Sequence, residues 1–452
     1  MKVDLSIPLL LSEIAEATGG VVGAEDKYVD FICTDSRELT KDGVFFALDK
    51  AEIYVKEALS AGAVVSRDPL ATVAVDDAGE ALLKLAAYYK TRLPHLKKTV
   101  AVTGSVGKTC VKDYTAAILS GKYNTHKTSE NRNNDIGLPL SILSAPSGTE
   151  ILVLEMGTNH PGEIRRLSLC AKPDLAIITG IGTSHIGNFG SKKIIAKEKS
   201  EIREGMTDPN ALIIPCGEPL LDGLPCLFKV GNGGDVDFSV IKSNADECVF
   251  VCTTPIGSTK EIRFPFGGEH YVRNLAFAVS AAVVLGIDID GINERLSECE
   301  QFLPRQKRIR VGNATFIDDS YNASLEAYES ALSVLSECQG TRSAVIGDVL
   351  ELGVYSERIH RAIGELCVKS KADKIYPFGK YAHDVAEGAV RAGFNQKNVF
   401  INDDPCDHAR TAALILENLV SGETVLVKGS HALHTEKIID CVKEMQGAKN
   451  DV

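Results

Sequence analysis

A glycine-rich segment of this 452-residue chain carries the residues best suited to phosphate chemistry, Thr103-Gly104-Ser105-Val106-Gly107-Lys108-Thr109. A β-rich run, Thr99–Val102, precedes it, and the apolar spacing of Val111–Leu119 predicts a helix after it. In that context backbone N–H groups hold phosphate oxygens, Lys108 neutralises the terminal phosphates, and Thr109 offers its hydroxyl to Mg²⁺. The segment predicts a phosphate-binding loop, shortened because Val102 stands where the strict pattern has glycine. The alternative is a glycine-rich turn with a solvated lysine.

Two polar residues follow other predicted strands of the same region. Glu155 ends the apolar run Ile151–Leu154, and His185 comes shortly after the run Leu175–Thr179. Ligands of open α/β sheets gather beyond the carboxyl ends of the strands, so both residues are expected beside the phosphate loop. We therefore interpret Glu155 and His185 as candidate metal ligands. The alternatives are a solvated acid and a structural histidine.

Three blocks can be separated along the chain, at 1–96, 97–308 and 309–452. The first mixes short strands with helices, while the second and third alternate buried apolar strands with helices, as parallel α/β sheets do. Within the second block, the stretch from Ala211 to Phe266 changes to short alternating strands and predicts an antiparallel insertion. The expected fold class is α/β, with a small N-terminal domain, a central phosphate-loop domain with a parallel sheet, and a C-terminal Rossmann-like domain. The third block lacks GxGxxG, so a dinucleotide role is not supported.

Individual elements are expected where apolar residues show a helical or strand period. Strands are predicted at Tyr28–Cys33, Gly43–Ala47, Thr315–Ile317, Ser343–Ile346, Lys374–Pro377 and Thr424–Val427. Helices are predicted at Tyr54–Ala61, Ala78–Tyr89, Leu138–Leu143, Glu163–Leu169, Val272–Leu285, Ala327–Leu335, Arg358–Val368 and Tyr381–Ala392.

Charge and composition exclude several classes of protein. The formal net charge is −12, which argues against a nucleic-acid or membrane partner, because such binding depends largely on basic patches. No apolar run is long enough to cross a membrane, and the first residues do not form a secretory signal. The 12 cysteines are scattered without zinc spacing, and most of them are expected to be small buried residues in a reducing cytoplasm. A metal site at Cys248 and Cys252 is the weaker alternative.

Short segments spread over nearly the whole chain occur in a highly specific order and spacing. They are Thr34-Asp35-Ser36-Arg37, the phosphate loop, Lys127-Thr128 with Asn131, Asn133 and Asn134, the run from Glu155 to Ile164, His185, Asp318-Asp319-Ser320-Tyr321-Asn322-Ala323, Gly347-Asp348-Val349-Leu350-Glu351-Leu352-Gly353, and Val427-Lys428-Gly429-Ser430. Together they resemble the Mur ligase family, the ATP-dependent ligases of peptidoglycan precursor synthesis. The resemblance implies the three-domain architecture of that family.

The resemblance implies roles for individual residues of the ATP site. Glu155 is expected to bind a first Mg²⁺ and His185 a second, with Lys199 carbamylated beside the second ion. Lys197 would take this role if the alignment with the family pattern were shifted. The alternative for both lysines is a position on a solvated, charged helix face. Among the residues expected to contact ATP, Asn274 matches an adenine contact, Arg305 a phosphate contact and Asp319 a ribose contact. An ordinary surface role is the alternative for these three. Residues expected to bind the other substrates are Ser36, Arg37, Asn133, Asn134, Asn322, Glu351 and Lys428.

The activity implied by the resemblance is ATP-dependent formation of an amide bond through an acyl phosphate. The expected substrates are a UDP-linked muramoyl tripeptide, held by block 1–96, and D-alanyl-D-alanine. ATP and two Mg²⁺ ions are the expected cofactors, and a cytoplasmic monomer is the expected state. Lys108, His185, Lys199 and Arg305 are the residues expected to act in catalysis.

The sequence departs from the family pattern mainly in the half that binds the acceptor. The loop after Leu48 is shortened before Tyr54, Glu130 stands where glycine is usual, and His431 stands where arginine is usual. A paralogous ligase acting on another acid, such as a pseudomurein precursor or a nickel tetrapyrrole, is therefore the alternative. A nucleotide-binding scaffold without catalysis and a generic phosphate-loop kinase are further alternatives that explain fewer of the segments.

Overall fold

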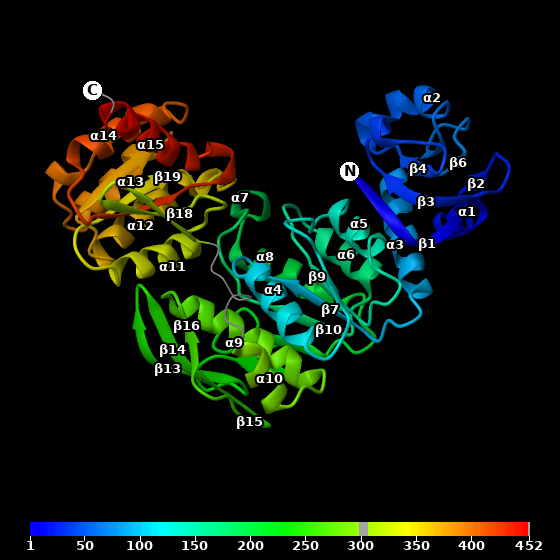
Figure 1. Cartoon of the computed structure of the whole chain (residues 1–452), viewed down its shortest axis with the longest axis horizontal. Helices are drawn as coiled ribbons and strands as arrows, with labels where there is room; N and C mark the ends of the chain where they lie inside the picture. Colours follow the sequence, from blue (N-terminus) through cyan, green and yellow to red (C-terminus); the bar gives the residue numbers. More distant parts are fainter. Residues whose placement is uncertain (298–305, 451–452) are drawn as a thin grey trace.

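The computed structural model describes residues 1–297 and 306–450 of the chain, and the structural statements below concern these residues. They form an N-terminal lobe, a central lobe and a C-terminal lobe, with the two outer lobes rising from opposite ends of the central one (Figure 1). Each lobe contains a sheet covered by helices, which confirms the expected α/β class. The boundaries at 96 and 308 stay a prediction.

The central lobe contains a six-stranded parallel sheet in the order β12-β11-β10-β7-β9-β8. Its strands are β7 (Lys98–Thr103), β8 (Thr125–Lys127), β9 (Ile151–Glu155), β10 (Leu175–Ile178), β11 (Leu212–Pro215) and β12 (Phe228–Val230). Because β7 lies between β9 and β10, the segments that follow these three strands meet at one edge of the sheet. The phosphate loop follows β7, so it lies between the segments that carry Glu155 and His185.

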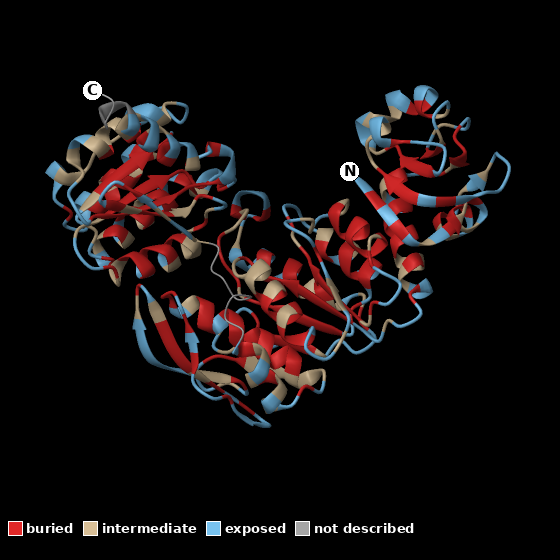
Figure 2. Ribbon diagram, in the orientation of Figure 1, coloured by how far each residue is buried: buried red, intermediate tan, exposed pale blue. Residues whose placement is uncertain are grey.

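Helices cover both faces of this sheet, and the strand β7 is buried on both sides (Figure 2). Val100 and Val102 of β7 pack in one cluster with α4 (Lys108–Leu119) and α9 (Glu269–Val284). Ala101 points the other way and packs in a second cluster with α5 (Gly137–Leu143) and α6 (Glu163–Ala171). Because these successive residues of β7 are buried on opposite faces of the sheet, the sequence here is continuously apolar. The helix α10 (Ile289–Leu296) lies against α4 and α9.

The prediction of an antiparallel insertion over Ala211–Phe266 is wrong in its first part. Strands β11 and β12 extend the parallel sheet, and the antiparallel sheet begins only afterwards. Short edge strands of a parallel sheet have the same apolar content as antiparallel strands, so the sequence pattern does not separate the two. The antiparallel strands are β13 (Asp237–Asn244), β14 (Glu247–Thr254), β15 (Gly257–Ser258) and β16 (Ile262–Phe264), with β14 pairing all three others. Cys248 and Cys252 lie on β14, and their side chains are buried in an apolar cluster of the central lobe.

The N-terminal lobe has a mixed six-stranded sheet in the order β1-β3-β4-β5-β6-β2. Its first strand was not predicted, and the helix predicted at Tyr54–Ala61 is instead a 3₁₀ helix followed by one short α-helical turn. Strands are β1 (Lys2–Leu10), β2 (Val21–Val22), β3 (Tyr28–Cys33), β4 (Gly43–Phe46), β5 (Ala63–Ser66) and β6 (Val73–Ala74); helices are α1 (Leu11–Thr18), η1 (Ser36–Glu38), η2 (Asp49–Tyr54), α2 (Val55–Ala58) and α3 (Ala78–Arg92). Helix α3 packs against α5 and α6, which joins this lobe to the central one.

The C-terminal lobe has a five-stranded sheet in the order β17-β18-β21-β19-β20, antiparallel only at β17. Helices α11 to α13 cover one face and α14 and α15 the other. Strands are β17 (Lys307–Val311), β18 (Ala314–Asp319), β19 (Arg342–Gly347), β20 (Lys374–Phe378) and β21 (Thr424–Lys428); helices are α11 (Leu325–Ser336), η5 (Gly353–Tyr355), α12 (Ser356–Lys369), α13 (Ala382–Arg391), η6 (Gln396–Asn398), α14 (His408–Asn418), η7 (His431–Leu433) and α15 (Glu436–Asn450). In the described part of the chain, no helix is both long and apolar enough to span a membrane.

Candidate active site

The phosphate loop has the backbone that its glycines permit. Gly104 and Gly107 adopt φ angles of +150° and +81°, and α4 begins directly afterwards at Lys108. No side chain among the described residues caps the N-terminus of α4, and the dipole of this helix favours an anion there. The ammonium of Lys108 donates a hydrogen bond to the carbonyl of Gly104 at 2.9 Å, which folds this side chain over the loop. The backbone N–H of Gly182 donates to Ser105 Oγ at 2.8 Å and braces the loop from the side of β10.

A cavity of about 510 Å³ lies beside this loop, between the central and C-terminal lobes. Its volume falls within the range of small-molecule sites. The cavity brings together most of the residues that the sequence singled out, although they come from distant parts of the chain. The predicted residues that line it are Ser105, Val106, Gly107, Lys108, Thr109, Asn133, Asn134, Glu155, His185, Asn274, Asp319, Asn322 and Lys428.

Glu155 presents a buried carboxylate oxygen that is unpaired in the described structure. The residue is 1% exposed, and its Oε1 accepts a hydrogen bond from Asn133 Nδ2 at 2.8 Å. Its Oε2 is buried and has no hydrogen-bond partner among the described residues. Leaving a buried carboxylate oxygen unpaired is costly, and a cation bound there removes the cost. Glu155 therefore fits the role of a metal ligand.

A divalent cation at this place needs ligands other than protein carboxylates. Within 1–297 and 306–450, no group of three or more His, Cys, Asp or Glu side chains is arranged to hold a metal ion. Mg²⁺ usually takes only one or two carboxylates from a protein and completes its shell with phosphates and water. The cavity supplies Glu155 and the Thr109 hydroxyl, which fits an ion brought in with a nucleotide.

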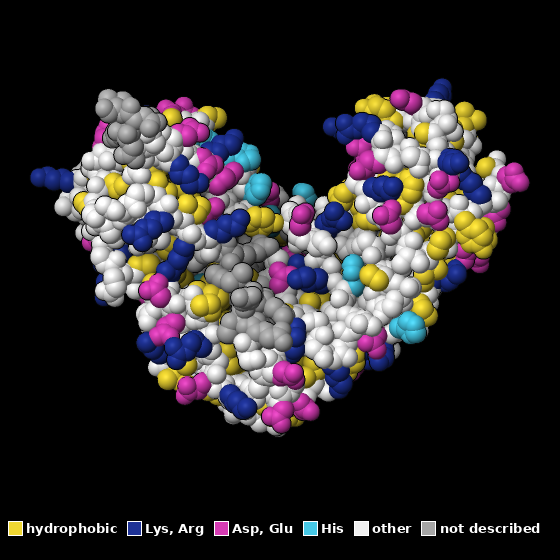
Figure 3. Space-filling view, in the orientation of Figure 1, with side chains coloured by type: hydrophobic (Ala, Val, Ile, Leu, Met, Phe, Trp, Pro, Cys, Tyr) yellow, Lys and Arg dark blue, Asp and Glu magenta, His cyan; other side chains and the backbone are white. Residues whose placement is uncertain are grey.

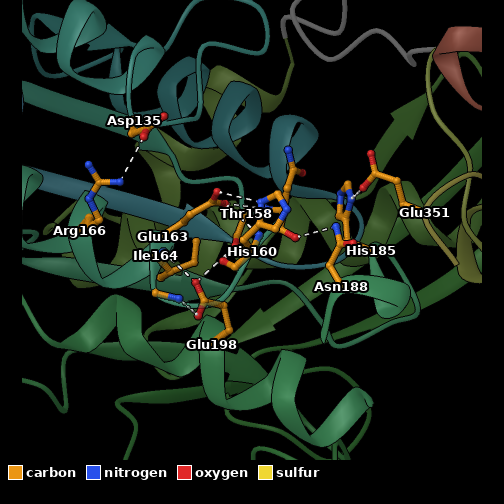
Figure 4. A network of polar contacts seen from close by, with 12 residues as sticks. Asp135, Thr158, His160, Glu163, Ile164, Arg166, His185, Asn188, Glu198 and Glu351 are labelled. Atoms are coloured by element: carbon orange, nitrogen blue, oxygen red, sulfur yellow. Dashed lines mark hydrogen bonds and ion pairs between the residues drawn. The ribbon is translucent and has the colours of Figure 1, made fainter. Parts of the chain in front are cut away.

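His185 is held by a carboxylate from the C-terminal lobe. Its Nδ1 contacts Glu351, and the two residues adopt left-handed backbone angles, with φ of +58° and +60° (Figure 4). Burial lowers the pKa of His185, Glu351 raises it, and the charges of Lys108 and Lys199 lower it further. Metal-binding histidines commonly donate one ring N–H to a carboxylate, which orients the other ring nitrogen. Glu351, expected to bind substrate, lies against His185 in this structure.

Lys199 is a buried lysine near the phosphate loop. It is 4% exposed and lies on α8 (Lys192–Ser200), whereas Lys197 on the same helix is exposed. Burial and the charge of Lys108 lower the pKa of Lys199 well below that of an ordinary lysine, with Glu198 acting in the opposite direction. In the part of the chain that the structure describes, Lys199 Nζ has neither a hydrogen bond nor an ion pair. Of the two candidate lysines, Lys199 therefore fits the predicted role better, since Lys197 faces solvent.

Glu198 fixes the loop between Glu155 and α6, a function that the sequence analysis missed. Its carboxylate, 3% exposed, accepts hydrogen bonds from the backbone N–H groups of Gly162 at 2.6 Å and Ile164 at 2.9 Å (Figure 4). The negative charge lies at the N-terminus of α6, where the helix dipole favours it. The residue sits in a run of charged residues that resembles a solvated helix face, so only its tertiary surroundings reveal the role.

The far side of the cavity is formed by α9 and by the C-terminal lobe. Asn274 of α9 is 6% exposed and lies against Gly107. Lys428 Nζ donates hydrogen bonds to Asp319 Oδ2 at 2.8 Å and to the carbonyl of Asn322 at 2.9 Å. The expected ATP contacts Asn274 and Asp319 thus border one cavity, and Arg305 lies outside the described residues.

Three predicted substrate residues, Ser36, Arg37 and Glu351, do not line this cavity. Ser36 and Arg37 lie on η1 of the N-terminal lobe, where Arg37 is exposed and pairs with Asp35 at 2.6 Å. A broad hollow separates the two outer lobes on the face shown in Figure 3. A ligand that reaches both η1 and the phosphate loop has to extend along the central lobe.

Replacement of Gly107 by alanine is expected to weaken nucleotide binding about tenfold or more. A Cβ at this position lies 2.6 Å from Asn274 Oδ1, and φ of +81° costs a residue with a side chain about 1–2 kcal/mol. Binding of a fluorescent ATP analogue measures the change, with Gly148→Ala, which meets no atom within 4 Å, as the control. Unchanged affinity of the Gly107 variant would show that the loop does not bind phosphate.

A phosphate-binding loop at the edge of a parallel sheet, faced by a second α/β lobe, defines a nucleotide-binding α/β protein. Comparisons with known proteins narrow this class. Residues 102–282 match the family model "Mur ligase middle domain", and residues 305–431 match "Mur ligase, glutamate ligase domain". The UDP-N-acetylmuramoyl-tripeptide–D-alanyl-D-alanine ligase of Bacillus subtilis is 33% identical over 95% of this chain and 97% of its own length.

Solved structures agree with this match. A MurF structure from Acinetobacter baumannii has a TM-score of 0.88 at 30% identity and covers 98% of this chain and 100% of its own. The MurF ligase of Thermotoga maritima in complex with ADP has a TM-score of 0.80 at 26% identity, covering 92% and 98%. The chain belongs to the Mur ligase family, as the sequence segments predicted.

Proposed function

We propose that this protein is an ATP-dependent ligase that joins D-alanyl-D-alanine to a UDP-N-acetylmuramoyl-tripeptide. The observation that supports this most is the match over nearly the full length to a relative named for that reaction. The cavity agrees with it, because a phosphate loop, a buried carboxylate and residues of the C-terminal lobe border one space. The relative in complex with ADP supports the use of ATP.

The proposed reaction begins with two anions that repel each other. A carboxylate oxygen of the tripeptide attacks the γ-phosphorus of ATP, the bond to the bridging oxygen breaks, and ADP leaves. The amine of D-alanyl-D-alanine then attacks the carbonyl carbon of the acyl phosphate, loses a proton, and phosphate leaves as the amide forms. Lys108, with Arg305 as expected from the family pattern, offsets the negative charge during the first step. The C-terminal lobe borders the cavity and, by closing over it, would exclude the water that hydrolyses the acyl phosphate.

Magnesium is proposed as the metal of this site, at two positions. Thr109 and Glu155 would hold the first ion, and His185, oriented by Glu351, would hold the second. The ions would supply positive charge that stabilises the transferring phosphoryl group. The unpaired Oε2 of Glu155 supports the first position, and the contact between His185 Nδ1 and Glu351 supports the second.

Carbamylation of Lys199 is proposed as part of the same site. An unprotonated amine that adds CO₂ becomes a carbamate and releases one proton, so a neutral buried amine is exchanged for an anion. The anion would lie near the positive charge of Lys108, the same charge that helps to lower the pKa of the unmodified lysine. Burial disfavours the charged form of Lys199 and so favours the unprotonated amine that the modification requires.

The carbamate is expected to give a carbonyl ¹³C resonance when the protein is equilibrated with ¹³C-bicarbonate. The same signal should be absent from the Lys199→Arg variant, because a guanidinium does not add CO₂ under these conditions. It should persist in Lys197→Arg, the matched control on the exposed face of α8. A signal that survives in the Lys199 variant, or is missing from the wild type, would contradict the proposal.

The remaining parts of the proposal concern the other substrates and the place of action. Ser36 and Arg37 are proposed to contact the UDP-linked substrate, and Asn133, Asn134, Asn322, Glu351 and Lys428 the reacting ends. We propose that the protein acts as a monomer in the cytoplasm, where ATP is available. The free cysteines of the described residues agree with a reducing compartment.

One observation favours a second candidate, a paralogous ligase for a different acid. The helix η2 begins at Asp49, directly after Leu48, so this loop of the N-terminal lobe is short. Mass spectrometry of reactions with a panel of acceptors separates the candidates. The leading proposal expects UDP-N-acetylmuramoyl-tripeptide to gain one D-alanyl-D-alanine and free D-alanine to add poorly. Addition to another carboxylic acid, with no product from the muramoyl tripeptide, would support the paralogue.

A further inference from the structure

The C-terminal lobe contacts the central lobe through a carboxylate that the proposed chemistry does not use. Glu326 lies in the first turn of α11, the helix of the C-terminal lobe whose residues Ala327, Ser330 and Ala331 line the cavity. Its side chain is 20% exposed and points away from its own lobe, toward the segment that follows β10. Glu326 is therefore one of the residues through which α11 and the central lobe contact each other.

Both carboxylate oxygens of Glu326 are paired with the central lobe. Oε2 accepts hydrogen bonds from the backbone N–H of Thr183 at 3.0 Å and from Thr183 Oγ1 at 2.8 Å. Oε1 pairs with Lys192 Nζ at 3.0 Å. Burial raises the pKa of Glu326, but the Thr183 N–H and the charge of Lys192 outweigh it and hold the pKa below its usual value. These three donors belong to two segments of the central lobe.

Those two segments carry two of the residues of the proposed metal site, His185 and Lys199. Thr183 stands two residues before His185, and Lys192 is the first residue of α8, the helix that carries Lys199. Gly182 permits the contact, because a Cβ there would lie 2.7 Å from the Glu326 carboxyl carbon. A single carboxylate of the C-terminal lobe thus ties α11 to the loop of His185 and to the start of α8.

We infer that Glu326 is a positioning residue that docks the C-terminal lobe against the central lobe and aligns these two segments for the proposed ligation. The inference rests on the proposed function for its kinetic consequence, whereas the docking itself is a property of the fold. In the proposed function, nucleotide phosphates bind to Lys108 and its loop, which belong to the central lobe. Loss of Glu326 should therefore impair turnover more than nucleotide binding.

The Glu326→Ala variant tests this inference in two ways. Its kcat is expected to fall about tenfold or more, since small misplacements of reacting groups have effects of that size, while its Kd for a non-hydrolysable ATP analogue stays within about threefold. In small-angle X-ray scattering with that analogue and Mg²⁺, the variant should show a larger radius of gyration than the wild type. Glu329→Ala is the matched control, because Glu329 is an exposed acid one turn nearer the middle of α11.

Variants of the partners keep the test valid if Glu326→Ala folds poorly. Thr183→Val removes one donor with little change in shape, and Lys192→Ala removes the charge; both should lower kcat in the same direction by a smaller factor. Combining Lys192→Ala with Glu326→Ala should add no further loss beyond Glu326→Ala alone. Equal losses in the Glu326 and Glu329 variants, or an unchanged radius of gyration, would overturn the inference. If the wild-type protein shows no ligase activity, the proposed function is refuted instead. The scattering result would then still show whether Glu326 docks the C-terminal lobe.

Discussion

The Lys108→Ala variant is expected to lose ATP-dependent ligation by about a thousandfold, with the loss mainly in kcat. Lys108 is the cation at the start of α4, and it lies over the phosphate loop with its ammonium on the Gly104 carbonyl. With a nucleotide bound, the same side chain is placed to neutralise phosphate oxygens. Removal of one well-placed donor from a site of developing charge costs about 10²–10³ in rate, and here a full charge is lost as well.

Initial rates of ADP formation with both substrates present measure this loss. Lys193→Ala is the control, because it removes an equal charge from an exposed position at the start of α8. The control should keep the wild-type rate within about twofold, as exposed charges away from special features contribute little. Turnover that survives Lys108→Ala would remove the phosphate loop from the mechanism.

The Glu155→Gln variant is expected to lower kcat about a hundredfold and to raise the concentration of Mg²⁺ needed for half-maximal rate. Glutamine keeps the size of the side chain and an oxygen that accepts from Asn133, but it has no charge for the ion. The thermal stability of the protein without Mg²⁺ should not fall, since Oε2 of Glu155 has no partner to lose among the described residues.

Reaction rates measured at increasing Mg²⁺ concentrations, together with thermal unfolding, separate an effect on metal binding from an effect on stability. Glu261→Gln serves as the control, because Glu261 is exposed and lies in the antiparallel sheet region away from the cavity. A Glu155 variant that unfolds at lower temperature and keeps the wild-type Mg²⁺ requirement would identify the carboxylate as structural. A raised Mg²⁺ requirement with unchanged stability would identify it as a ligand.

The features that the sequence predicted correctly depend on local patterns. The phosphate loop lies between β7 and α4 because its glycines, the strand before it and the helix after it are contiguous in the chain. The placement of Glu155 and His185 beside the loop follows from one rule, that parallel strands present their carboxyl ends at a single edge. The third block also has the α/β sheet that its apolar runs indicate.

The features that the sequence could not predict depend on tertiary placement. The strands β11 and β12 are too short for their period to distinguish a parallel edge from an antiparallel insertion. Glu198 and Glu326 stand among other charged residues on helices, and only the packing of α8 against α6 and of α11 against the central lobe gives them partners. The contact between His185 and Glu351 joins residues 166 positions apart, which no local pattern contains.

The central claim is most directly tested by phosphate release from ATP by the purified protein with Mg²⁺. Four reactions are compared, with UDP-N-acetylmuramoyl-tripeptide alone, D-alanyl-D-alanine alone, both, or neither. We expect release only with both substrates, one phosphate for each product molecule that is heavier by one dipeptide. No release with both, from protein that still binds ATP, would contradict the assigned substrates and shift support to the paralogous ligase. Equal release in all four reactions would contradict ligation altogether.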